Sequence, residues 1–252
     1  MGQKSSLVII GNEILSGRTQ DKNTSWIGDK MAAHGVPLAE VRVVPDIEEK
    51  IIEAVNAMRE EYDFVFTTGG IGPTHDDITA ACIAKAFGVA FGRHDDAYQV
   101  LLEYYGPDEL TDARATMADM PDGATLIPNP VSGAPGFRVE NVFVMAGVPR
   151  IMQAMLESVI ADIAPGKTIM SNTITCNLQE SIVAEGLGQV QDKYEDVEIG
   201  SYPSFRGGQL NVSVVLRSTE DGSIKQATKD VLALIDDRGG EVLSEVYQVP
   251  LS

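Results

Sequence analysis

The chain has 252 residues, of which 44% are hydrophobic and 22% charged, so it can bury the core of one large domain or of two smaller ones. Its 19 lysines and arginines against 37 aspartates and glutamates give a net charge of −18. Such a surface repels nucleic acids and anionic membranes, and we expect neither as a partner. Free phosphorylated ligands are repelled as well, so a phosphate site here needs backbone N–H groups or a metal ion.

Cysteine usage and the first residues bear on location. Cys82 and Cys176 lie far apart without metal-ligand spacing, which favours a reducing compartment, with a single disulfide as the alternative. Residues 1–6 are polar, and the apolar run 7–10 is too short to span a bilayer. We therefore expect a cytoplasmic protein without a targeting segment.

Strand and helix signals alternate through the first 160 residues. This alternation favours a parallel sheet with helices on both faces, whose ligands bind at the carboxyl ends of the strands. The hydrophobic pattern predicts strands at 7–10, 41–44, 64–67 and 126–127, a hairpin of 137–139 and 142–145, and helices at 23–34, from 46 to about 58, 76–87, 95–105, 111–119 and from 147 to about 163.

The pattern changes after Ala164-Pro165-Gly166, a turn-forming segment that we expect to separate a domain of residues 1–165 from one of residues 166–252. The second domain has 7 lysines and arginines against 13 aspartates and glutamates, which argues against nucleic-acid binding. It is predicted as a β-α-β-β-α unit, with strands at 168–176, 197–202 and 209–218 and helices at 178–191 and 224–237.

A glycine-rich turn follows the third predicted strand. Three glycines between a strand and a helix allow a tight turn whose N–H groups approach an anion, although the pattern is neither a Walker loop nor a dinucleotide-binding fingerprint. The alternative is a plain compact turn. The residues predicted to bind the ligand in this turn are Thr68, Gly69, Gly70, Gly72, Pro73 and Thr74.

Four carboxylates accompany the predicted turn. Asp76 and Asp77 are also what a helix dipole favours at its first turn. Next to a phosphate, however, they would repel the ligand unless a divalent cation intervened. Asp46 is predicted to cap its helix, and its carboxylate can also face the pocket. Together with Glu13 in the loop after the first strand, these residues make Asp77, Asp46 and Glu13 the candidate metal ligands, and Asp77, Asp46 and Asp76 the candidate catalytic residues.

Two further loops are candidates for ligand contacts. The polar loop 11–23 contains Glu13, and its alternative is a solvated loop in which Asn23 caps the next helix. The loop 128–136 places Asn129, Ser132 and Gly136 among prolines, which lower the ordering cost of binding. The three histidines have no metal-ligand spacing, and no serine has a recognisable base partner.

Residues 69–79, Gly-Gly-Ile-Gly-Pro-Thr-His-Asp-Asp-Ile-Thr, resemble the signature of the MoaB/MogA-like molybdopterin-binding fold. More narrowly, the chain is similar to the amino-terminal domains of the CinA (competence/damage-inducible) family and of eukaryotic FAD synthase. Segments 11–17, 128–137 and 147–149 support the resemblance, which spans residues 7–165. It implies a three-layer αβα domain with a sheet of mixed direction and a pocket around residues 68–77, followed by a smaller α+β domain of the CinA type.

The resemblance also implies chemistry. In molybdenum-cofactor adenylylating relatives, acidic residues matching Asp46 and Asp77 are needed for catalysis, whereas CinA-like and FAD-synthase-like relatives are associated with metal-dependent hydrolysis of ADP-ribose or FAD. Many CinA proteins have Lys where this chain has His75, so the hydrolase subtype stays open. The resemblance covers neither the NMN-deamidase domain of CinA nor the FAD-synthesising domain, and we expect neither activity.

Three hypotheses follow for the function. The first is a nucleotide pyrophosphatase that depends on Mg²⁺, Mn²⁺ or Co²⁺. The second is binding or adenylylation of molybdopterin at the same turn. The third is a non-catalytic nucleotide-binding module with a protein partner. In each case the ligand is a phosphorylated small molecule, a nucleotide diphosphate or a pterin, and we expect a homo-oligomer.

Overall fold

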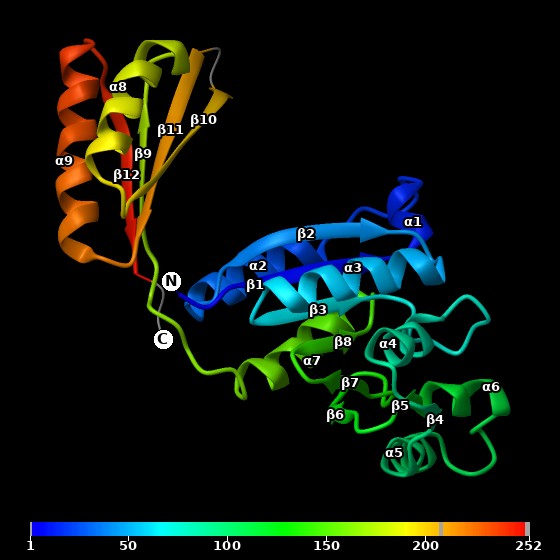
Figure 1. Ribbon diagram of the computed structural model, residues 1–252. Helices are drawn as coiled ribbons and strands as arrows, with labels where there is room; N and C mark the ends of the chain where they lie inside the picture. The colour runs from blue at the N-terminus through cyan, green and yellow to red at the C-terminus, as the bar shows by residue number, and fades with distance from the viewer. Residues whose placement is uncertain (1, 207–208, 250–252) are drawn as a thin grey trace. The chain divides into compact units, whose positions relative to one another are not determined.

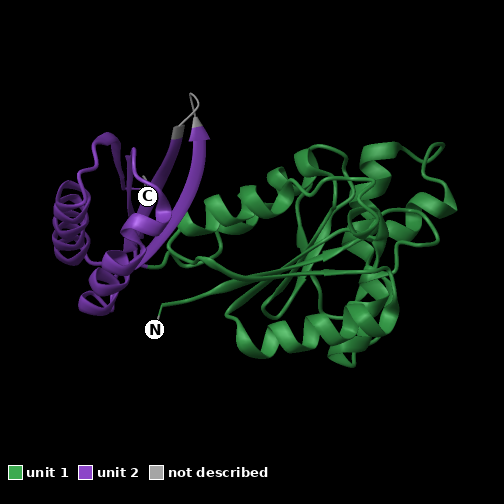
Figure 2. Cartoon of the chain, turned by 90° about the horizontal axis from the view of Figure 1, so that it is seen from above, with its two compact units in different colours: residues 1–166 green, residues 167–252 purple. Residues whose placement is uncertain are grey.

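The computed structural model describes residues 2–206 and 209–249. The chain divides into two compact units, residues 1–166 and 167–252 (Figure 2). In the part of the chain that is described, no helix has the length and apolar character needed to cross a membrane.

Unit 1 contains a six-stranded sheet of mixed direction (Figure 1). Its first four strands are mutually parallel, and the fifth is antiparallel to both of its neighbours. The strands follow the order β2 (Leu38–Val44), β1 (Ser5–Ile10), β3 (Phe64–Thr68), β8 (Val142–Met145), β7 (Gly136–Val139) and β6 (Thr125–Ile127).

Helices cover both faces of this sheet, which confirms the predicted αβα layers. Alternate residues of β1 belong to different cores because neighbouring side chains of a strand point to opposite faces. Val8 and Ile10 pack with α3 (Glu48–Glu61) and α4 (Thr79–Phe87). Leu7 and Ile9 pack with α2 (Asn23–Ala33) and α7 (Pro149–Ile160) on the other face.

The sheet is not wholly parallel, as strand–helix alternation alone had suggested, and the mixed direction implied by the resemblance is confirmed. The reason is the short Glu140–Asn141 connection between β7 and β8, because strands joined by two residues can pair only antiparallel. A segment between α4 and β6 contains α5 (Asp95–Tyr105), α6 (Asp112–Ala115), the 3₁₀ turn Thr116–Ala118 and a small ribbon of β4 (Phe91–Arg93) and β5 (Asp119–Pro121), strands that the sequence did not predict.

Unit 2 is a four-stranded antiparallel sheet with its hydrophobic core under two helices. The predicted β-α-β-β-α order is present, and a fourth strand, not predicted, pairs with the first. That strand is exposed along its whole length and therefore lacks the alternation that marks a half-buried strand. The elements are β9 (Met170–Cys176), α8 (Glu180–Lys193), β10 (Glu198–Arg206), β11 (Gln209–Ser218), α9 (Asp221–Asp237) and β12 (Val242–Gln248).

Both cysteines are buried free thiols, Cys82 in unit 1 and Cys176 in unit 2. Burial raises the pKa of Cys82 to about 11, so its thiolate is scarce at neutral pH. We expect an aromatic disulfide reagent at pH 8 to label neither thiol of the native protein quickly and to label both in denaturant. Rapid labelling of native protein, followed as absorbance of the released thiol, would contradict this burial.

Candidate active site

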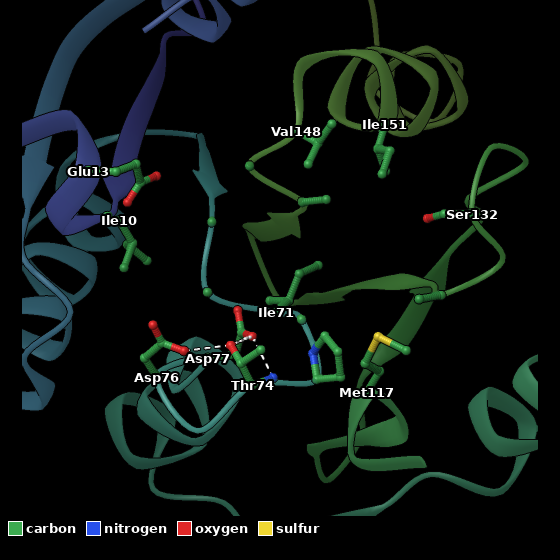
Figure 3. A pocket seen from close by; sticks show the side chains of 18 of the residues that line it. Ile10, Glu13, Ile71, Thr74, Asp76, Asp77, Met117, Ser132, Val148 and Ile151 are labelled. Atoms are coloured by element: carbon green, nitrogen blue, oxygen red, sulfur yellow. Dashed lines mark hydrogen bonds between the residues drawn. The ribbon is translucent and has the colours of Figure 1, made fainter. Parts of the chain in front are cut away.

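A pocket of about 520 Å³ opens at the carboxyl edge of the sheet (Figure 3). The strand register creates this edge, because Thr68 lies beside Ile9 on one side and beside Met145 on the other. The loops that leave β1, β2, β3 and β8 therefore meet at one place, as expected for a sheet of this class. The pocket is lined by Ile10, Gly11, Glu13, Thr19, Asp46, Gly69–Thr74, Asp76, Asp77, Met117, Asn129, Ser132, Ala134 and Ala146–Pro149 with Ile151.

Most of the site residues proposed from the sequence line this one pocket, although they come from four separate loops. Two do not line it. Thr68 is a buried residue of β3, and Gly136 is a buried residue of β7 packed against the Val144 carbonyl. Those that do are Glu13, Asp46, Gly69, Gly70, Gly72, Pro73, Thr74, Asp76, Asp77, Asn129 and Ser132.

The glycine-rich turn is fixed from behind by Thr79, the first residue of α4. The Thr79 N–H donates to the Gly70 carbonyl and its hydroxyl donates to the Gly69 carbonyl, each at 3.0 Å. Gly69 and Gly70 have φ values of 106° and 66°, a region that side-chain-bearing residues rarely adopt. Within the described residues, no acceptor pairs with the N–H groups of Gly70, Ile71 and Gly72. Successive free N–H groups of this kind form an anion-binding concavity.

The residues between the turn and α4 form a carboxylate cluster around Thr74, and the helix begins at Thr79 rather than at the predicted residue 76. Asp77 Oδ2 accepts from the Thr74 N–H at 2.9 Å and from its hydroxyl at 2.6 Å. Asp76 Oδ1 lies 2.5 Å from the same hydroxyl. These local bonds compete with helix formation, which explains the later start. Each carboxylate keeps a second oxygen for a ligand.

The charge of Asp76 follows from this contact. The hydrogen bond from the Thr74 hydroxyl lowers the pKa of Asp76 below its ordinary value. A lowered carboxyl pKa means that the group stays ionised at neutral pH and gains a proton only in more acidic solution. The pocket therefore presents negative charge directly beside the free N–H groups of the turn (Figure 3).

Asp46 does not cap the helix that follows it, so this part of the prediction is wrong. The cap position of α3 is Ile47, which makes no side-chain bond, because the Ile47 N–H turns back to the Pro45 carbonyl at 2.7 Å. The Asp46 carboxylate instead accepts from the Asn12 N–H at 2.9 Å, at the start of α1 (Asn12–Leu15). This bond ties the loop that carries Glu13 to the end of β2.

The carboxylates do not form a ready-made metal cage. Among the described residues, no three His, Cys, Asp or Glu side chains are gathered closely enough to hold an ion. Asp77, Asp46 and Glu13 nevertheless line the same pocket. Mg²⁺ commonly binds through one or two carboxylates together with substrate phosphates and water. The residues thus fit an ion that enters with a phosphorylated ligand, not one that the protein holds by itself.

Asn129 organises the loop that follows β6. Its Oδ1 accepts from the N–H groups of Val131 and Ser132 at 3.1 Å, and its Nδ2 donates to the Ser132 hydroxyl and the Ala134 carbonyl. The amide is thus satisfied within the loop, although the residue also lines the pocket.

Truncation of Asn129 should therefore cost stability. Asn129→Ala leaves two loop N–H groups and one carbonyl unpaired, and we expect the free energy of unfolding to fall by about 1–3 kcal/mol. Urea denaturation measures this change. Ser132→Ala, which removes a single contact of the same amide, is the matched control with a smaller loss. Equal losses in the two variants would contradict this role of Asn129.

The structure adds site residues that the sequence did not single out. Thr79 closes the turn, and Met117, Val148 and Ile151 form an apolar side of the pocket. Asn23 was predicted to cap its helix, but the Asp21 carboxylate accepts from the first N–H groups of that helix instead. The Asn23 amide crosses to the Gly147 carbonyl at 2.9 Å, because Asn23 is buried against the loop that leaves β8.

The fold and the pocket together define an α/β domain of the molybdopterin-binding type. Residues 6–165 match the family described as the probable molybdopterin binding domain, and the chain belongs to this family. Residues 168–240 match the middle domain of FAD synthase. The family resemblance predicted from the sequence is thereby confirmed.

Several relatives narrow the similarity. The crystal structure of the protein CinA from Thermoplasma acidophilum is 36% identical, with a TM-score of 0.60 over 64% of this chain and 97% of that one. A protein from Archaeoglobus fulgidus is 34% identical over 92% of this chain and 98% of its own length. A CinA-like protein from Salinibacter ruber is 30% identical over 94% of this chain, which matches 60% of that longer relative. The chain is thus CinA-like over most of its length.

Proposed function

We propose that unit 1 is a metal-dependent hydrolase that cleaves the diphosphate bond of a nucleotide diphosphate such as ADP-ribose or FAD. One observation carries the proposal: the free N–H groups of Gly70, Ile71 and Gly72 and the carboxylates of Asp76 and Asp77 line the same pocket. N–H groups alone would suffice to bind phosphate. The adjacent carboxylates make sense if a divalent cation accompanies the ligand.

The turn and the carboxylates have separate tasks in the reaction. The N–H groups of Gly70–Gly72 bind the phosphoryl oxygens and stabilise the negative charge that grows on them. Asp77, with Asp46 or Asp76, would hold the divalent ion, which supplies Lewis-acid polarisation of the phosphoryl group. One water molecule is consumed and the bond from phosphorus to the bridging oxygen breaks. Each product carries one phosphate monoester, and the proton passes to solvent.

Product analysis tests the proposal. We expect purified protein with Mg²⁺, Mn²⁺ or Co²⁺ to convert ADP-ribose to AMP and ribose 5-phosphate, and FAD to AMP and FMN. Chromatography of the reaction, with a metal chelator added as the control, follows both substrates. Intact ADP-ribose and FAD after incubation with all three metals would refute a hydrolase of this kind.

Molybdopterin binding is the second candidate, favoured by the description of the family as a probable molybdopterin binding domain. A pterin phosphate would place its phosphate on the same turn and its ring against the apolar side of the pocket, Val148 and Ile151. Titration with molybdopterin, followed by tryptophan or pterin fluorescence, tests this candidate. Saturable binding without hydrolysis of any nucleotide would favour it over the hydrolase.

A further inference from the structure

A second pocket of about 450 Å³ lies beside the first, and the two share a wall. Gly70, Ile71, Gly72, Pro73 and Thr74 line both pockets. The phosphate-binding turn is therefore the partition between two cavities and not the end of one. A ligand whose phosphates lie on this turn has room for a substituent on each side.

The second pocket is mainly apolar and carries an aromatic ring at its surface. Phe91 of β4 lines it and is 48% exposed, whereas the Phe137 side chain behind it is fully buried. A half-exposed phenylalanine in a hollow offers a flat face on which a heterocyclic base can stack. Met120 and Ile78 continue the apolar lining.

Polar groups lie at the same pocket in positions suited to a sugar. Asp119 and Thr116 line it together with His75. One carboxylate oxygen of Asp119 accepts from Arg93 Nε at 2.6 Å, which fixes the side chain and leaves its other oxygen for a hydroxyl group. A carboxylate held in this way is a good acceptor for ribose hydroxyls but repels phosphate. The second pocket therefore suits a nucleoside and not a second phosphate.

From this juxtaposition we propose that the substrate is a diphosphate esterified at both ends, with one nucleoside or sugar in each pocket. The first pocket has its own apolar side at Val148 and Ile151, the shared turn binds the diphosphate, and Phe91 stacks on the far base. This inference rests on the proposed nucleotide-diphosphate site and narrows its substrate class. A nucleoside diphosphate with a free terminal phosphate fills only half of the site.

Calorimetric titration with two probes tests the proposal. Diadenosine diphosphate carries the same nucleoside at both ends, and ADP carries it at one. We expect the wild-type protein to bind diadenosine diphosphate at least about tenfold more tightly than ADP, since stacking one base on an aromatic ring contributes roughly 1–3 kcal/mol. Phe91→Ala should reduce the affinity for diadenosine diphosphate to that for ADP. Phe91→Tyr, which keeps a ring, should restore it.

Phe205→Ala is the matched control, because Phe205 is an exposed phenylalanine of unit 2 and lines neither pocket. Thermal melting checks that all variants are folded. Equal affinities of the wild-type protein for the two probes, no binding of either, or an unchanged affinity in Phe91→Ala would each overturn the proposal. Two-pocket binding of diadenosine diphosphate without its cleavage would instead refute the hydrolase and leave the two-pocket site standing.

Discussion

Asp77→Asn should lower kcat/KM for diphosphate hydrolysis by about a hundredfold or more while leaving the fold intact. The asparagine oxygen can still accept from the Thr74 N–H, so the local turn keeps its main bond. What disappears is the negative charge that a divalent ion needs beside the phosphate, an interaction worth several kcal/mol in the transition state. Initial rates across a Mg²⁺ or Mn²⁺ titration measure the effect.

Asp95→Asn is the control for this substitution. Asp95 is also an aspartate at the start of a helix, it is exposed, and it lines neither pocket. Its variant should keep the wild-type rate and metal dependence, since it alters only a helix-end charge. If Asp77→Asn retained wild-type activity at every metal concentration, Asp77 would not be a metal ligand in the reaction.

Local sequence signals were sufficient for most of the fold of unit 1. The apolar run at 7–10 and the glycine-rich segment after Thr68 each mark a strand end, and parallel strands bring such ends to one edge. The placement of Glu13, Asp46 and Asp77 around one pocket follows from that edge. The reversed direction of β7 depends on the length of one connection, and alternation of strands and helices does not encode it.

Side-chain partners that lie far away in the sequence escaped prediction for a different reason. Asp46 has the pattern of a helix cap, but its carboxylate bonds to Asn12, 34 residues earlier. Asn23 has the same pattern and bonds to Gly147, 124 residues later. Local propensity describes which partner is nearest along the chain, whereas tertiary contacts decide which partner is nearest in space.

The second pocket was invisible for a related reason. Phe91 lies in a three-residue strand, too short for any hydrophobic period, and the strand exists because it pairs with Asp119–Pro121. A pocket built from two short paired segments and the back of a loop leaves no contiguous motif. The turn itself was recognisable because its glycines meet a steric requirement that is written into a few adjacent residues.

The largest loss of stability is expected for Gly69→Ala, because two separate costs meet at this position. The φ of 106° is strained for any residue with a side chain, and the added methyl group would collide with the Ile10 carbonyl, a backbone atom that cannot rotate away. We expect the free energy of unfolding to fall by roughly 3–5 kcal/mol, which lowers Tm by about 6–20 °C for a protein of this size.

Gly88→Ala separates the two costs. Gly88 ends α4 with a φ of 66°, and a methyl group added there meets nothing within 4 Å. This variant carries only the conformational penalty of about 1–2 kcal/mol. The difference between the two melting curves therefore measures how closely the turn approaches the end of β1. Similar Tm values for the two variants would mean that the turn can move away from Ile10, and a turn that moves so easily could not hold its N–H groups in place for a phosphate.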